Sequence, residues 1–141
     1  MGSSLMVIIG ESEEHLGNCI PPLLGPSCYV ARGSGAKRKM DILARIESDP
    51  PSMIYVPQIE NGLPYWEVMS LYWNIKEKRE EMRSVITPFS LYFLDHVDGE
   101  DLFILEKDIL TPIFLHPVYL NWKGYSVSFG AMYLDYYGER R

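Results

Sequence analysis

The sequence predicts an α+β fold. We expect a single two-layer domain whose mixed sheet ends in an antiparallel C-terminal meander and carries two main helices, 36–47 and 64–84, packed on one face. Three observations support this fold class. Residues 27–56 follow the order strand, turn, helix and strand. Residues 64–84 form the clearest helical pattern in the chain. After Pro88 the hydrophobic period changes from helical to the strand period of about 2, with turn signals between short segments.

The length of 141 residues suits one domain, so we expect residues 1–141 to fold as a single unit. Residues 1–4 are expected to be disordered or a cloning remnant, and residues 17–26 to form a loop rich in proline and glycine. Each strand expected in the first half is a short apolar run bounded by turn residues. The expected elements there are strands at 5–9, 27–31 and 52–56 and a helix at 36–47, with Ser34 as its N-cap.

The helix predicted over 64–84 has two unlike halves. Its first half is apolar on almost every side and must be covered by a core or a partner, whereas residues 76–81 are all charged and must reach water. Trp66 and Trp73 are seven residues apart and therefore lie on one stripe of the helix. The predicted partner-binding residues are Tyr65, Trp66, Tyr72 and Trp73.

The second half of the chain is expected to consist of strands. Residues 89–94 are expected to form a strand, and Asp98-Gly99 is a strong hairpin signal that would pair Phe93 with Ile104 and make 102–105 a return strand. Residues 106–110 are ambiguous between helix and strand. The remaining strands of the predicted meander are 112–116, 118–122 and 125–136.

The turn between the strand 27–31 and the helix 36–47 combines glycines with cations. Free backbone N–H groups and the helix dipole at such a turn favour an anion. Cations in the first turn are by themselves unfavourable to the dipole, which indicates a bound anion or an acidic partner. The alternative is a solvated basic helix start in which the glycines only shape the turn. The predicted ligand-binding residues are Arg32, Gly33, Ser34, Gly35, Lys37 and Arg38.

The same run, Arg32-Gly33-Ser34-Gly35-Ala36-Lys37, resembles the acyl-CoA loop of the GNAT family of N-acetyltransferases, in which Arg-Gly-x-Gly-x-Gly/Ala opens a helix. Lys37 stands where the last small residue of that motif belongs, and the strands and helices that precede the loop in that family have no room here. The resemblance implies an alternative function: a small enzyme or sensor that binds a phosphorylated ligand or CoA at Gly33–Lys39.

The sequence predicts no metal ligand, no cofactor and no catalytic residue, and it leaves open whether the protein is an enzyme. The acidic segment 95–101 offers carboxylates to a hard cation, but its spacing fits a charged hairpin tip better. No nucleophile elbow, HExxH motif or Ser-His-Asp order is present. The isolated candidates for zinc binding or for a Cys–His pair are His15, His96, His116, Cys19 and Cys28.

Composition narrows the classes of function. The net charge of −6 argues against nucleic acid as the main ligand, and no apolar run reaches the length of a membrane span. Two cysteines without a secretory signal favour a reduced, cytoplasmic protein. The aromatic fraction of 13% suits interfaces as well as sheet packing. We therefore expect a small acidic interaction protein of inhibitor, chaperone or phage and viral accessory type, with a protein partner or a homo-oligomer and no catalysis.

Overall fold

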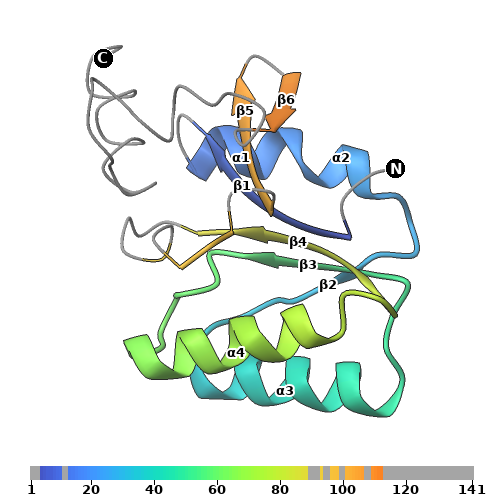
Figure 1. The fold of residues 1–141 in the computed structure, drawn as a ribbon, viewed down its shortest axis with the longest axis vertical. Helices are drawn as coiled ribbons and strands as arrows, with labels where there is room; N and C mark the ends of the chain where they lie inside the picture. The colour runs from blue at the N-terminus through green and yellow to red at the C-terminus, as the bar shows by residue number, and fades with distance from the viewer. Residues whose placement is uncertain are drawn as a thin grey trace.

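The structure is a computed structural model that describes residues 4–10, 13–88, 93, 96–98, 101–106 and 109–112. Its strands are β1 (Leu5–Gly10), β2 (Tyr29–Val30), β3 (Met53–Pro57), β4 (Arg83–Thr87), β5 (Leu102–Glu106) and β6 (Ile109–Pro112). They form one six-stranded sheet in the order β2-β3-β4-β1-β5-β6 (Figure 1). The neighbouring strands β2, β3, β4, β1 and β5 all run parallel to one another. Only β6, at the edge, pairs antiparallel, with β5.

Helices cover both faces of this sheet. They are α1 (Glu13–Cys19), α2 (Pro21–Leu24), α3 (Gly35–Ser48) and α4 (Tyr65–Glu77). The helices α3 and α4 lie side by side against one face, and α1 and α2 lie on the other (Figure 1). Among the described residues, no helix is long and apolar enough to span a membrane.

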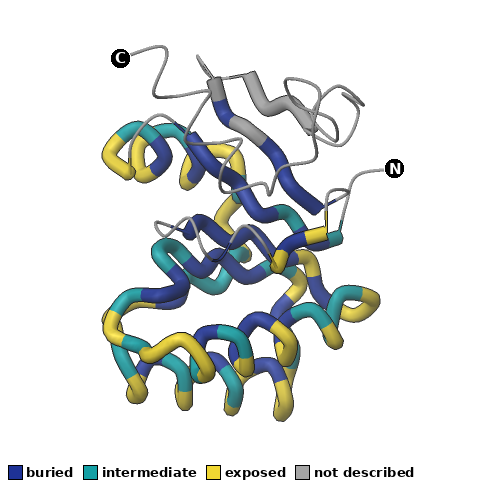
Figure 2. The backbone as a smooth tube through the Cα atoms, turned by 60° about the vertical axis from the view of Figure 1, so that its left-hand side comes forward, coloured by how far each residue is buried: buried dark blue, intermediate teal, exposed yellow. Residues whose placement is uncertain are grey.

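Alternating side chains of β1 enter two separate cores. Leu5 and Val7 pack into the core beneath α3 and α4, whereas Ile8 packs with Leu16 and Ile20 beneath α1 and α2. Because both faces are covered, the central strand is an uninterrupted apolar run, as parallel strands usually are. Exposure is correspondingly concentrated on the outer sides of the helices (Figure 2).

The predicted α+β fold class is wrong, because the protein is a three-layer α/β fold built on a mainly parallel sheet. The error arises at the helix predicted over 64–84. Helix α4 ends at Glu77, turns follow, and residues 83–87 form β4 between β3 and β1. The charged residues before β4 have high helix propensity, but pairing on both sides of β4 decides its conformation. Because β4 is the strand that joins β3 to β1, the sheet could not be predicted as parallel without it.

The predicted hairpin at Asp98-Gly99 is also wrong. Both edges of β5 are occupied, by β1 in parallel and by β6 in antiparallel pairing, so Phe93 cannot pair with Ile104. Phe93 is instead helical and packs edge-on against Tyr72 of α4, with ring centroids 5.0 Å apart. The strands predicted at 118–122 and 125–136, and 112–116 beyond Pro112, lie outside the described residues.

The elements of the first half lie close to their predicted positions. The strands at 5–9, 27–31 and 52–56 correspond to β1, β2 and β3, and the helix at 36–47 corresponds to α3. Part of the segment 17–26 is helical rather than a loop, because α1 reaches Cys19 and α2 follows. Within 106–110, both Glu106 and Ile109 belong to strands. The single domain over 1–141 stays a prediction.

Candidate functional site

The topology itself indicates where a ligand would lie. In parallel α/β sheets, ligands bind outside the carboxyl ends of the strands at the point where successive connections leave on opposite faces. Strand β1 leads to α1 and Leu16 on one face. Its neighbour β4 leads to Phe93, which lies in the core of the other face. The switch point of this fold is therefore the carboxyl edge between β1 and β4.

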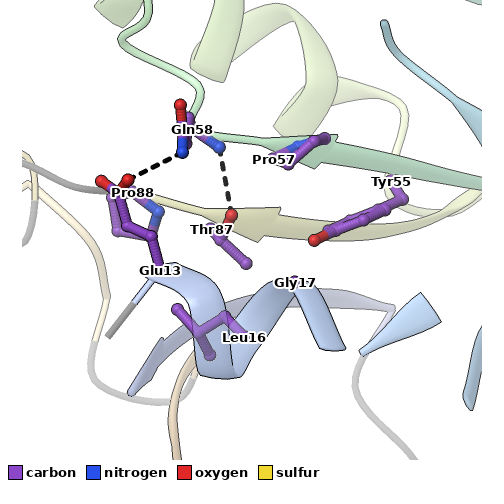
Figure 3. Close-up of a pocket in the computed structure, with 8 residues that line it drawn as sticks. All are labelled: Glu13, Leu16, Gly17, Tyr55, Pro57, Gln58, Thr87 and Pro88. Carbon is purple, nitrogen blue, oxygen red and sulfur yellow. Dashed lines mark hydrogen bonds between the residues drawn. The ribbon is translucent and has the colours of Figure 1, made fainter. Parts of the chain in front are cut away.

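A small pocket opens beside this switch point (Figure 3). It has a volume of about 80 Å³ and is formed by α1 and by the ends of β3 and β4. Ligand pockets for whole small molecules are commonly about 300–1,000 Å³, so this one suits an ion or a single functional group. Its lining residues are Glu13, Leu16, Gly17, Tyr55, Pro57, Gln58, Thr87 and Pro88.

The turn after β3 forms one wall of the pocket. Gln58 has a φ of 49°, in the left-handed region that residues other than glycine rarely adopt. Thr87, the last residue of β4, holds this turn: its Oγ1 accepts the backbone N–H of Gln58 at 3.1 Å, and its carbonyl accepts that of Ile59 at 3.2 Å. Uncommon backbone conformations persist only where the surroundings determine them, and they cluster at binding sites.

Arg38 supports the same turn from beneath. Its guanidinium donates from Nη1 to the carbonyl of Pro57 at 2.8 Å and from Nη2 to the carbonyl of Gln58 at 2.7 Å. The side chain is only 4% exposed, and burial lowers its pKa more than the attraction of Glu60 raises it. Arg38 was predicted as an anion ligand, but the structure places it inside the protein as a clamp on two carbonyls. Arg38 lies four residues before the buried Ile42 and so shares the inner face of α3, a spacing that the sequence analysis did not use.

The other residues of the predicted anion site stand at the start of α3. Arg32, Gly33, Ser34 and Lys37 are exposed. Ser34 occupies the N-cap position, but its side chain makes no capping hydrogen bond.

The backbone N–H of Gly35 donates to the carbonyl of Asn61 at 3.0 Å. Gly62 lies so close that a Cβ added to it would be 2.8 Å from the nitrogen of Gly35. The first N–H of α3 is therefore used by the neighbouring turn, and Gly62 must be a glycine. The six predicted residues do not converge on one pocket, because Arg38 alone turns inward.

The polar groups of the switch-point pocket come from segments far apart in the sequence. Gln58 Nε2 donates to Oε2 of Glu13 at 2.8 Å across 45 residues. Burial raises the pKa of Tyr55 more than the neighbouring side chain of Thr87 lowers it, so its phenol stays neutral at neutral pH. Among the described lining residues, Glu13 is the one with a formal charge at neutral pH. The sequence analysis did not predict these residues as a site. The buried strand that ends at Gly10 could have indicated it, because Glu13 follows shortly after the carboxyl end of that strand.

The aromatic residues of α4 divide into two groups. Trp66 is 72% exposed, Trp73 49% and Tyr65 46%, whereas Tyr72 is completely buried. The hydroxyl of Tyr65 lies 2.7 Å from Nε2 of His96, at hydrogen-bond distance. Three of the four residues predicted for partner binding are thus on the surface, and Tyr72 belongs to the core.

One end of the exposed aromatic row is held by a charge pair. Lys76 Nζ lies 5.0 Å from the ring centroid of Trp73 and forms an ion pair with Asp98 at 2.6 Å. His96 and Asp98 both contact residues of α4, so residues 96–98 lie against this helix. Asp101, in the same acidic segment 95–101, is buried and pairs with Arg79 at 3.1 Å.

Scans of protein-family models, curated proteins and solved structures found no match to this chain. Within the part of the chain that the structure describes, no three His, Cys, Asp or Glu residues cluster as metal ligands would. Cys19 Sγ lies 3.7 and 3.9 Å from the two ring nitrogens of His15. These nearly equal distances align neither nitrogen with the thiol as an activating base would be aligned. Cys28 is a free cysteine whose pKa is raised by burial, so a reactive thiolate is not favoured there.

Proposed function

We propose that this protein is a small acidic cytoplasmic interaction protein that binds a protein partner through the outer face of α4, without catalysis. The observation that carries the proposal is the joint exposure of Trp66 and Trp73 on one stripe of that helix. We call the residues Trp66, Met69 and Trp73 the tryptophan stripe. Met69, between the two indoles, is half-buried and packs against the core.

The stripe has the composition of an interface centre rather than of ordinary surface. Tryptophan is rarely left exposed and is enriched among the residues that dominate binding energy. Lys76 lies over the ring of Trp73 and is itself held by Asp98. A ring that is oriented before binding loses less conformational entropy when the partner arrives.

Charge indicates the kind of partner. The protein has a net charge of −6, and α4 carries Glu67 in its first turn and ends at Glu77. A partner with a basic surface would therefore be steered towards this face and would associate faster at low salt. We infer a basic protein partner with an apolar centre that receives the two indoles.

The direct test is affinity capture from the native host with the double variant Trp66→Ala/Trp73→Ala. Both side chains are exposed, so the variant should keep its stability within about 0.5 kcal/mol. The matched control is Leu23→Ala, because Leu23 is 67% exposed on α2 at the opposite face of the sheet. A partner retained by the wild type and by the control but lost by the double variant supports the proposal. Recovery of the same proteins with all three chains would contradict it.

Self-association through the same stripe is the competing outcome. Light scattering coupled to size exclusion distinguishes it, because a dimer that becomes a monomer in the double variant would make a second copy of the chain the partner.

Binding of phosphate or CoA at Gly33–Lys39 has weaker support. Arg38 is committed to two carbonyls, and the first N–H of α3 is committed to Asn61. Thermal unfolding with and without CoA, nucleotides and phosphate tests it, since a bound ligand raises the melting temperature by mass action.

A further inference from the structure

We propose that the switch-point pocket binds a small primary ammonium group, with the carboxylate of Glu13 as its counter-ion. The pocket lies beside α1, whereas the tryptophan stripe lies on α4 at the opposite face of the sheet (Figures 1 and 3). This inference therefore does not rest on the proposed function.

The first argument is that the polar wall of the pocket is held in place. Arg38 and Thr87 together fix the turn at Gln58, and the side chain of Gln58 then donates to Oε2 of Glu13 at 2.8 Å. The side chain of Glu13 is exposed, and this contact orients its carboxylate while its second oxygen, Oε1, has no hydrogen-bond partner among the described residues. Arg38 therefore holds the turn at Gln58, and Gln58 in turn holds the carboxylate of Glu13 at the mouth of the pocket.

The second argument is the sign of the charge. Glu13 supplies one negative charge, and the described lining includes no lysine, arginine or histidine. Carboxylate, hydroxyl and phenol oxygens line the pocket from Glu13, Thr87 and Tyr55. An anion would be repelled here, and a cation would be attracted.

The third argument distinguishes an ammonium group from a metal ion. Calcium takes about six to eight oxygen ligands, usually from several carboxylates, but this pocket offers one carboxylate, half of which is occupied by Gln58. An ammonium group has three donors and no need for a closed oxygen shell. The apolar walls at Leu16, Pro57 and Pro88 suit the adjoining alkyl carbons. A volume of about 80 Å³ admits such a group with a short chain.

The test is a titration of the full chain with propylammonium chloride at neutral pH and constant ionic strength, followed by amide chemical shifts. We expect saturable changes centred on Gln58 and Thr87. 1-Propanol, which has the same shape without the charge, and tetramethylammonium, which has the charge without N–H donors, should produce none. Saturable changes with magnesium or calcium chloride and none with the amine would overturn the assignment in favour of a metal.

Variants locate the site. Glu13→Gln keeps the shape of the side chain and should weaken amine binding about twofold to fivefold, because an exposed ion-pair partner is lost. Tyr55→Phe retains the ring that packs in the core and should also weaken binding. Glu14→Gln is the matched control, since Glu14 is an exposed neighbour on the same helix that does not line the pocket. Equal binding by the wild type and Glu13→Gln, or equal losses in Glu13→Gln and Glu14→Gln, would refute the inference.

A free amine and a lysine side chain share this chemistry. N-acetyl-lysine methylamide separates them: tighter binding than propylammonium assigns the pocket to a lysine of another protein, and weaker binding assigns it to a free small amine.

Discussion

Replacing Arg38 by methionine tests the arrangement on which the pocket depends. The substitution keeps a long apolar side chain but removes the donors of two charged hydrogen bonds, at 2.8 and 2.7 Å, to the carbonyls of Pro57 and Gln58. Each charge-assisted bond is worth about 1.5–3 kcal/mol. Glu60, which is 4% exposed, also loses a favourable charge. We therefore expect the free energy of unfolding to fall by about 3–5 kcal/mol.

Urea unfolding followed by far-ultraviolet circular dichroism measures this loss. Arg38→Lys should recover only part of it, because an ammonium group cannot donate to two carbonyls with the planar geometry of a guanidinium. Lys37→Met is the matched control: Lys37 is the exposed neighbour on α3, and its replacement should cost no more than about 0.5 kcal/mol.

Two results would refute the reasoning. A loss below about 1 kcal/mol in Arg38→Met would mean that the two hydrogen bonds contribute little. A rise in the wild-type melting temperature with phosphate that disappears in Arg38→Met, while stability without phosphate is unchanged, would make Arg38 an anion ligand after all.

Further predictions concern buried phenols and glycines. Tyr72→Phe should raise the free energy of unfolding by about 1 kcal/mol in urea titrations, because the buried hydroxyl of Tyr72 has no hydrogen-bond partner among the described residues. Burial raises the pKa of both Tyr55 and Tyr72. Above about pH 10 the unfolded state loses phenol protons that the folded state keeps, so stability measured between pH 8 and 11 should fall as the pH rises, and less steeply in Tyr72→Phe. Gly62→Ala should lower stability by about 2 kcal/mol or more in thermal unfolding, because φ is 77° and the added Cβ would meet Gly35. Gly17→Ala, where an added Cβ meets no atom within 4 Å, should not lower it.

The exposure of the tryptophan stripe was partly accessible from sequence. The spacing of Trp66 and Trp73 places them on one stripe, but it does not say which stripe of an almost wholly apolar helix is left uncovered. The structure decides this because Phe93 and the sheet cover the side that carries Tyr72. Arg38 was misassigned for the same reason. Its residue type suggested an anion ligand, but its position on α3 places it on the buried face of the helix with Ile42 and Ile46.

The sequence by itself determined the local elements of this protein: the apolar runs of β1 and β3, the start of α3 at the turn that contains Gly33 and Gly35, and the start of α4 after Pro64. Their signals lie within a few residues of one another, in propensity, period and turn chemistry. Only the tertiary structure decided that residues 83–87 leave the helical pattern and enter the sheet between β3 and β1. It also decided that Glu13 meets Gln58 across 45 residues. Both outcomes depend on pairing and packing between distant segments, which local propensity does not encode.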